Sequence, residues 1–389
     1  MRILIHGSER PLHIQQFQPL MELLNSNPKS EYIFFQSLSD LPLQPRNKIL
    51  HRFRDFCWDR FGYTRNNYNE KNWYWIWKQK GQEAIRLEQP KNDWNYPCSP
   101  IKSKLPWKPD LIIGTTPHEG HMRYQLIPWA NKNKIPILSV DHGAPLVPYT
   151  FGTYRGSMMG CTANAVWGSV SKAINVGYGA PASGQVITGS PTLDEISTLI
   201  QPRSNSRKQI LLMTTHREPL KSAMDSMMEQ VIDKYLSNSE FEIVVKPHPL
   251  ELISGTLKRL PKEVRIITEQ GDLHSCIQEA HCIVSPATSV IIPALAMSIP
   301  FVNILQPNSG LNDRNELEKL NQHIGPATFT PEQLTDVIEG RLTSNPEACK
   351  IAFEQLGYKA DGKNAARVLH LAEHLSSGNK PNSWIDPFK

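Results

Sequence analysis

Residues 2–8 read Arg-Ile-Leu-Ile-His-Gly-Ser, and residues 209–213 read Gln-Ile-Leu-Leu-Met. The first run is closed by Gly7, and residues 17–24 then carry apolar side chains at helical spacing. Short runs that are apolar at almost every position are typical of strands buried on both faces of a parallel sheet. Each run therefore predicts the first strand of an α/β domain, followed by a loop and a helix.

Further strands of the same kind are expected in both halves of the chain, each bounded by Pro, Gly or polar residues. They fall at residues 32–35, 110–114, 135–140, 241–245, 264–267, 282–284 and 300–304. Because both halves repeat the order of strand, loop and helix, the sequence predicts two Rossmann-like, doubly wound α/β domains that face a common cleft.

The join between the two domains is expected near residues 186–191 and in the polar stretch 201–207, whose Ser, Asn, Pro and Arg content is typical of an exposed linker. We therefore assign residues 1–190 to an N-terminal domain, 205–365 to a C-terminal domain and 366–389 to a C-terminal tail.

Tryptophan-rich sequence interrupts the first domain at about residues 50–108. The tryptophans are Trp58, Trp73, Trp75, Trp77, Trp94 and Trp107. We interpret this segment as an insertion that covers the cleft. Aromatic packing of an irregular helical segment and a platform for an acceptor or a membrane surface both remain open.

The composition is that of a globular protein, with 39% hydrophobic and 20% charged residues among 389. Lys and Arg number 42 against 37 Asp and Glu, a formal net charge of +5. This mild excess suits anionic small molecules or an anionic membrane surface, and it is too small to predict a nucleic-acid partner.

The six cysteines form no Cys-x-x-Cys pair and have no accompanying His spacing, so we expect neither a zinc site nor a disulfide framework and assign no metal. No cationic and apolar leader precedes the first strand, and no run of 18 apolar residues occurs. We therefore expect a cytoplasmic protein, and any contact with the inner face of the membrane would be peripheral.

Residues 244–249, Val-Val-Lys-Pro-His-Pro, end a predicted strand of the second domain. Lys246 and His248 would stand at the carboxyl edge of the sheet, where open α/β sheets bind ligands, and the flanking prolines would fix where His248 points. Both side chains can donate hydrogen bonds to phosphate oxygens, and a protonated His248 could assist a leaving phosphate.

Hydroxyl residues Ser285, Thr288 and Ser289 follow the strand at 282–284 and open an apolar helix. Backbone N–H groups at a helix start, with added hydroxyls, bind anions, so a diphosphate is expected there. If this strand and the strand ending at Val245 were neighbours, both turns would converge on one anion.

His216 and Arg217, in the loop after residues 209–213, would suit a nucleotide phosphate, and the loop with Gly7, Ser8 and Arg10 would face the same cleft. Neither loop is a P-loop or a Gly-x-Gly-x-x-Gly fingerprint. ATP hydrolysis by that route and dinucleotide redox chemistry are therefore not supported.

Asp141, His142 and Gly143 close the strand at 135–140. A carboxylate next to an imidazole is a candidate base pair, and we favour His142 as the catalytic group because adjacent residues of an extended segment point to opposite faces.

The preceding strand is followed by His118, Glu119, His121 and Arg123, which offer another acid, two imidazoles and a guanidinium. We count Glu119 among the catalytic candidates and His118 and Arg123 among the cleft residues. Two histidines alone are too few ligands to predict a metal site.

Together these residues resemble the GT-B superfamily, in which two Rossmann-like domains hold a nucleotide-activated donor between them. Lys246-Pro-His-Pro249, His142-Gly-Ala-Pro-Leu146 and the hydroxyl cluster 285–289 resemble the CDP-glycerol glycerophosphotransferases and related capsule or teichoic-acid transferases. The resemblance implies that His142 is the base and that the other two segments hold the donor's phosphates. Ala144 stands where that family has Thr.

Thr215-His-Arg217, Ile187-Thr-Gly-Ser190 and Gly7-Ser-Glu-Arg-Pro11 instead look similar to the UDP-N-acetylglucosamine 2-epimerases, which share the fold. This resemblance adds Ser190 to the donor-binding residues. Those enzymes also have acidic residues in Gln-Gly-Asp and Val-Glu-Ala-Gly-Leu-Arg contexts. This chain has Asp-His-Gly-Ala-Pro where the second would fall and nothing matching the first.

Our first hypothesis is a metal-independent GT-B transferase of polysaccharide biosynthesis, such as capsule synthesis, which needs no cofactor. It would move a sugar or a glycerol-phosphate-like group from a CDP-, CMP- or UDP-linked donor in the second domain to a glycan or lipid-linked acceptor in the first. The alternatives are a nucleotide-sugar 2-epimerase, which needs no acceptor, and a nucleotide-sugar-binding protein without turnover.

Overall fold

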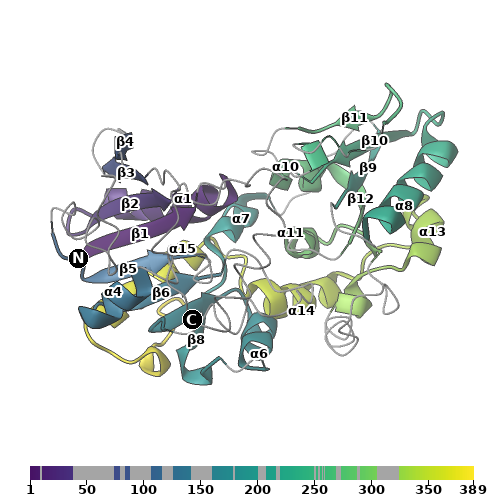
Figure 1. The fold of residues 1–389 in the computed structure, drawn as a ribbon. Helices are drawn as coiled ribbons and strands as arrows, with labels where there is room; N and C mark the ends of the chain where they lie inside the picture. The colour runs from purple at the N-terminus through teal and green to yellow at the C-terminus, as the bar shows by residue number, and fades with distance from the viewer. Residues whose placement is uncertain are drawn as a thin grey trace, which may run out of the picture.

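The apolar runs of the sequence form the centres of two separate sheets in the computed structural model (Figure 1). The structure describes residues 1–8, 11–37, 74–78, 84–87, 107–115, 126–141, 160–177, 180–199, 207–215, 220–248, 251–252, 255, 257, 259–268, 273–286, 290–304 and 324–389. The prediction of two α/β domains with Rossmann-like sheets is confirmed.

The first sheet has the strand order β4-β3-β2-β1-β5-β6-β7-β8. Its strands are β1 (Arg2–Ser8), β2 (Glu31–Ser37), β3 (Tyr74–Lys78), β4 (Ala84–Leu87), β5 (Leu111–Gly114), β6 (Ile137–Val140), β7 (Ala163–Val166) and β8 (Gln185–Ile187). The pairings of β3 with β2 and with β4 are antiparallel, and the other pairings are parallel.

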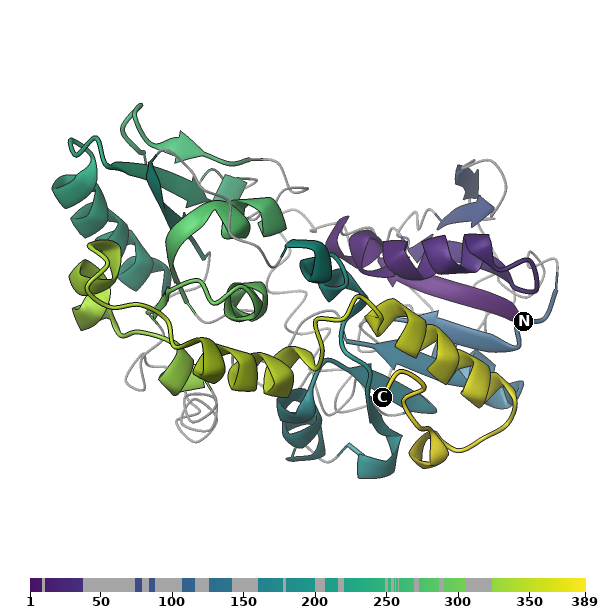
Figure 2. The same ribbon diagram turned by 180° about the vertical axis from the view of Figure 1, so that it is seen from behind.

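Two helices far apart in the sequence cover one face of the first sheet. α1 (Pro11–Ser26) and α15 (Asn364–Ser376) lie side by side there (Figure 2). Phe17 of α1 and Val368 of α15 pack with Ile5 of β1 in one buried cluster. The predicted tail at residues 366–389 thus contains most of α15, which buries its apolar side against the first sheet.

The other face of this sheet is covered by α4 (Ile127–Lys132), which packs on Leu4 and Ile112. α6 (Ser169–Gly177) begins shortly after β7, and the short 3-10 helix η3 (Ala182–Gly184) precedes β8.

The second sheet has the order β11-β10-β9-β12-β13 and is parallel throughout. Its strands are β9 (Lys208–Met213), β10 (Phe241–Lys246), β11 (Arg265–Ile266), β12 (Ala280–Ser285) and β13 (Phe301–Asn303). Its helices are α8 (Leu220–Tyr235), α10 (Leu273–Glu279), α11 (Ile291–Ala296), α13 (Leu334–Ile338) and α14 (Pro346–Gly357), with 3-10 turns η6 (Gly325–Ala327) and η7 (Pro331–Gln333).

Strands β10 and β12 are not neighbours, because β9 lies between them. The ends at Val245 and Val284 are therefore separated by one strand, roughly 10 Å at the usual strand spacing. The condition that would bring His248 and the turn after β12 onto one anion by direct adjacency is not met.

A buried cluster of hydrophobic residues joins the two domains. It contains Trp167, which follows β7, and Met213, which ends β9, together with Phe353 of α14. Gly168 lies so close to the end of α14 that a Cβ there would be 2.2 Å from the carbonyl oxygen of Gln355. The two sheets are thus packed through a continuous core and a close backbone contact.

The chain crosses between the domains twice, and the two crossings are fastened to each other. The first includes η4 (Pro191–Leu193) and α7 (Ile196–Leu199), and the second lies between α14 and α15. Asp194 accepts hydrogen bonds from the backbone N–H groups of Asn364 (2.7 Å) and Ala365 (2.8 Å) at the start of α15. Asp194 therefore caps the helix that follows the second crossing.

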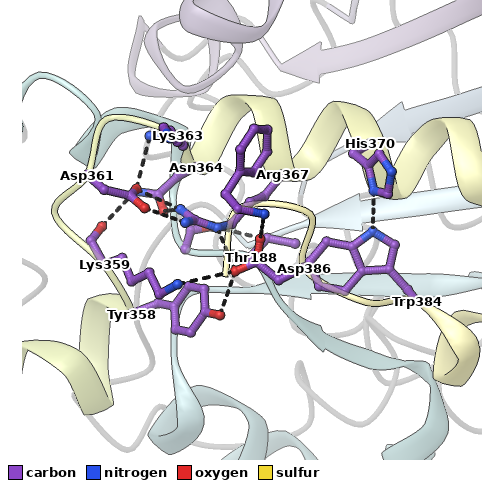
Figure 3. A network of polar contacts seen from close by, with 12 residues as sticks. Thr188, Tyr358, Lys359, Asp361, Lys363, Asn364, Arg367, His370, Trp384 and Asp386 are labelled. Carbon is purple, nitrogen blue, oxygen red and sulfur yellow. Dashed lines mark hydrogen bonds and ion pairs between the residues drawn. The ribbon is translucent and has the colours of Figure 1, made fainter.

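The residues after α15 fold back onto this junction (Figure 3). They include η8 (Pro381–Ser383). The guanidinium of Arg367 is fully buried, donates to Asp386 at 3.1 Å and pairs with Asp361. Its carbon lies 5.2 Å from the ring centroid of Tyr358, whose hydroxyl also donates to Asp386. This network fixes the C-terminal segment to the second crossing.

Only part of the predicted tryptophan-rich insertion at 50–108 is described. β3 and β4 form a hairpin-like antiparallel pair that extends the first sheet beyond β2. Trp58, Trp73 and Trp94 lie outside the described residues, so the prediction that this segment covers a cleft stays a prediction. Among the helices that the structure describes, none is both long and apolar enough to cross a membrane.

Candidate functional site

Each sheet contains a point at which the order of successive strands reverses, so that the next strands are added on the other side of the first one. β1 is flanked by β2 and β5, and β9 is flanked by β10 and β12. In open α/β sheets, ligands bind outside the carboxyl ends of the strands at such points. The buried cluster that contains Trp167 and Met213 lies at the carboxyl ends of β7 and β9. The carboxyl edges of both sheets, where ligands are expected, therefore contact the same cluster.

In the second domain, the loop after β10 is tied to the end of β9. The backbone N–H of His248 donates to Thr214 Oγ1 at 3.0 Å and to Glu251 Oε2 at 3.2 Å. The Thr214 hydroxyl in turn donates to the same Glu251 oxygen. The carbonyl of His248 accepts from the backbone N–H of Glu251 at 2.8 Å. Both peptide groups beside the His248 side chain are therefore held.

Glu251 is fully buried and is paired with a cation from the neighbouring helix. Lys221 Nζ of α8 lies 3.3 Å from Glu251 Oε1 and 2.8 Å from Asp225 Oδ2. Burial of the Lys221 ammonium acts to lower its pKa, but the hydrogen bonds and charges of Asp225 and Glu251 outweigh it, so the pKa is raised. Lys221 therefore stays charged and compensates the buried carboxylate.

Lys246 and His248 lie at the carboxyl edge predicted for them, and both are half-buried. Ser285 ends β12 and is buried, and its hydroxyl donates to the carbonyl of Pro286 at 3.0 Å. That hydroxyl is engaged locally in this structure. Thr288 and Ser289 lie outside the described residues, as do His216 and Arg217.

In the first domain, Asp141 follows β6 and its carboxyl accepts a hydrogen bond from Asn164 Nδ2 at 3.1 Å. Burial raises the pKa of Asp141 to about 7, although hydrogen bonds from Asn164 and Asn175 act to lower it. The carbonyl of Asp141 accepts from Trp167 Nε1 at 2.7 Å. The carboxyl group can therefore gain and lose a proton near neutral pH, and its backbone is fixed to the residue that joins both domains.

The two asparagines beside Asp141 are themselves held by Gln185. Its side-chain oxygen accepts from Asn164 Nδ2 and from Asn175 Nδ2, each at 3.1 Å. All three amide side chains are buried. The shared Gln185 oxygen therefore links the two asparagines to each other beside the carboxyl group.

A row of buried residues, all polar except Gly114, crosses the first sheet just inside its carboxyl edge. His6 is paired in register with Gly114, Gly114 with Ser139, Ser139 with Asn164 and Asn164 with Gln185. Residues in register on parallel strands present their side chains on the same face. Asp141, two residues beyond Ser139, belongs to this face, so the row leads to the Asp141 carboxyl.

Of the remaining sequence candidates in the first domain, three are described in part. A Cβ on Gly7 would lie 2.8 Å from the Phe34 ring, so the glycine permits this packing. Ser8 is the last residue of β1. Ser190 is fully buried and its hydroxyl contacts that of Thr192 at 2.9 Å, at the first crossing between domains.

The other first-domain candidates lie outside the described residues. They are Arg10, His118, Glu119, Arg123, His142 and Gly143. The preference for His142 over Asp141 as the catalytic group therefore stays a prediction, as does the role of the loop after β5.

Sequence reasoning missed Glu251, Thr214, Lys221 and the amides that hold Asp141. Glu251 follows His248 by three residues, the spacing at which a carboxylate can reach back to a backbone N–H at a helix start, and this could have been noticed. Asn164, Asn175 and Gln185 carry no such signal, because their mutual contacts depend on the packing of β7, α6 and β8.

Among the described residues, no group of three or more His, Cys, Asp or Glu side chains is arranged to hold a metal ion. The described cysteines are free thiols, at positions 161, 276, 282 and 349. Burial raises the pKa of Cys282 to about 12, so this thiol is not a reactive nucleophile at neutral pH.

Neither a protein-family model nor a curated protein matches this sequence. Among solved structures, the chain is similar to S. aureus MnaA in a co-structure with UDP, at 15% identity over 99% of this chain and 100% of that one, with a TM-score of 0.59. It is also similar to a UDP-GlcNAc 2-epimerase from Neisseria meningitidis bound to UDP-GlcNAc, at 14% identity over 97% and 100%, with a TM-score of 0.56.

A third similar structure is a UDP-GlcNAc 2-epimerase from Methanocaldococcus jannaschii in complex with UDP-GlcNAc and UDP, at 14% identity over 95% of this chain and 99% of that one, with a TM-score of 0.53. At these identities the likeness is one of fold. The chain has the GT-B architecture that its sequence motifs predicted.

Proposed function

We propose that this protein is an enzyme that acts on a nucleotide-activated sugar, and that it inverts C2 of a UDP-linked N-acetylhexosamine. The proposal is supported by likeness along nearly the whole chain to structures named as UDP-GlcNAc 2-epimerases and solved with UDP or UDP-GlcNAc. The observation within this chain that carries it is the Asp141 carboxyl, whose pKa is raised by burial to about 7 at the carboxyl end of β6.

Inversion at C2 breaks one C–H bond and forms another on the opposite face of the same carbon. A base must take up the proton and an acid must return one, so the product is an isomer and no acceptor is consumed. A group with a pKa near the working pH serves either step efficiently, and because the two steps act on opposite faces of C2, a fixed group serves only one of them. Asp141 has this property, and its amide network holds it in one place. The proposal thus places proton transfer on Asp141, where the sequence favoured His142.

The second domain would bind the diphosphate of the same substrate. Lys246 supplies a positive charge and His248 supplies a ring N–H at the carboxyl edge of the sheet, and both can donate to phosphate oxygens. The backbone of His248 is fixed on both sides by Thr214 and Glu251, so the segment that carries the ring needs little reordering to bind. A mild positive net charge favours approach of such an anionic substrate.

A transferase is the second candidate, and the Lys246-Pro-His-Pro249 segment favours it. A cation and an imidazole beside a nucleotide diphosphate would also stabilise a phosphate that departs as the sugar or glycerol-phosphate-like group is transferred. The acceptor would then be a glycan or lipid-linked precursor of a surface polysaccharide, and contact with the cytoplasmic face of a membrane would belong to this activity. A nucleotide-sugar-binding protein without turnover is the third candidate.

Product analysis separates these candidates. The protein is incubated with UDP-N-acetylglucosamine alone, and the nucleotide sugars are separated by chromatography. An epimerase forms the C2 epimer with no acceptor present, which is the result we expect. Release of UDP only when an acceptor is added would establish the transferase instead, and binding with no product from any donor would leave only the binding protein.

A further inference from the structure

We infer that Glu251 is a positioning residue that fixes the main chain of His248, and so the point from which the imidazole reaches the diphosphate of the ligand; this rests on the function proposed above. No motif in the sequence pointed to Glu251. Its side chain is fully buried, and its contacts come from three segments: the end of β9, the loop after β10 and the first turn of α8.

The contacts of Glu251 converge on one residue. One carboxylate oxygen accepts from the His248 N–H and from the Thr214 hydroxyl, while the backbone N–H of Glu251 donates to the His248 carbonyl. The Thr214 hydroxyl has a single proton, which it gives to Glu251, so its oxygen is left to accept from the His248 N–H at 3.0 Å. The carboxylate thereby also fixes the direction of the second hydrogen bond to His248.

Burial of a charged group costs desolvation free energy that the ion pair often does not recover. Replacement of a buried ion pair by well-packed apolar residues is often neutral or stabilising, so packing alone does not account for a carboxylate here. What the carboxylate does provide is an acceptor for two donors at once beside a half-buried imidazole. The Lys221 ammonium lies 3.3 Å from its other oxygen and holds it in place.

Glu251→Gln tests this arrangement with little change in shape. The amide keeps one oxygen, but its NH₂ group must face either the Lys221 ammonium or the Thr214 hydroxyl proton, where it meets another donor. The hydroxyl of Thr214 can then rotate, and one or both hydrogen bonds to the His248 N–H weaken. The main chain that carries the imidazole is loosened while the core of the sheet is retained.

The experiment is a double-mutant cycle read by calorimetric binding of UDP and of uridine. In the wild-type background, Glu251→Gln should weaken UDP binding about tenfold and leave uridine within about twofold, because only UDP carries the phosphates that His248 contacts. In the His248→Ala background, Glu251→Gln should weaken UDP no further. Asp225→Asn is the matched control: it removes the charge of the other carboxylate beside Lys221 and should leave UDP affinity within about twofold.

Loss of UDP affinity that is as large in the His248→Ala background as in the wild type would overturn the inference, as would equal loss for uridine. If Glu251→Gln does not fold, Thr214→Val removes the bridging hydroxyl and should give the same pattern. If His248→Ala weakens UDP and neither Glu251→Gln nor Thr214→Val does, Glu251 is not a positioning residue and the proposed function stands. If the wild type binds no UDP, both the inference and the proposed function fail.

Discussion

Replacement of Asp141 by Asn should change how the stability of the protein depends on pH. Burial raises the pKa of this carboxyl from its ordinary value of 3.8 to about 7 in the folded state. Between these values the folded state binds a proton that the unfolded state has released. The free energy of unfolding of the wild type therefore falls as the pH rises from about 4 to about 7, and the contribution is constant above that.

The size of the effect follows from the shift. One pKa unit corresponds to about 1.4 kcal/mol, so a shift from 3.8 to about 7 makes the ionised folded state less stable by about 4 kcal/mol. From pH 5 to pH 8 the part of this change that can be observed is about 3 kcal/mol. Asp141→Asn removes the titrating group and keeps an acceptor for Asn164, so the variant should gain this amount over the wild type across that range.

Urea unfolding of both proteins at several pH values between 5 and 8 measures the difference. Asp233→Asn on the exposed side of α8 is the matched control, and its difference from the wild type should not change with pH. A difference between Asp141→Asn and the wild type that stays constant within about 1 kcal/mol from pH 5 to pH 8 would refute the assignment of a raised pKa to Asp141.

Two further substitutions test the packing of the domains. Asp386→Asn takes one of two carboxylates from the fully buried Arg367, and urea unfolding at pH 7 should show a loss of about 3 kcal/mol; a loss below about 1 kcal/mol would mean that the pair contributes little. Gly168→Ala would place a Cβ against the Gln355 carbonyl oxygen and should lower the free energy of unfolding by about 1–3 kcal/mol, whereas Gly177→Ala, which meets no atom within 4 Å, should be close to neutral. Equal effects of the two glycine substitutions would contradict the close contact between α6 and α14.

The two-domain α/β fold could be predicted because its signal is local. Runs such as residues 2–8 and 209–213 are buried on both faces, so nearly every position is apolar and the strand is visible without knowledge of its neighbours. β7 and β8 were not predicted. Each has only three or four residues and includes an amide, Asn164 or Gln185, that is acceptable in a buried strand only because the folded chain supplies its partners.

The order of strands and the place of the last helix depend on long-range packing. The residues around Val245 and Val284 do not indicate that β9 lies between β10 and β12. An order in which β10 and β12 were neighbours would fit the same apolar pattern. α15 is amphipathic, but its assignment to the first sheet comes from a cap supplied by Asp194 and from packing on α1.

The candidate site could be predicted only in part, because some of its residues have a local signal in the sequence and others depend on long-range packing. Lys246 and His248 could be found because polar residues at the end of an apolar strand fall at the edge where ligands bind. Glu251 and the amides around Asp141 act through side chains brought together by the fold, and a raised pKa arises from burial that the sequence does not display.

The most direct test of the central proposal is the fate of the hydrogen on C2. UDP-N-acetylglucosamine is incubated with the protein in D₂O without acceptor, and the proton spectrum is followed by NMR. We expect loss of the C2 proton signal and appearance of the C2 epimer, with a rate that falls about 10²–10⁴-fold in Asp141→Asn and is unchanged in Asp233→Asn. Retention of the C2 proton at full intensity, with the substrate bound, would contradict the proposed function.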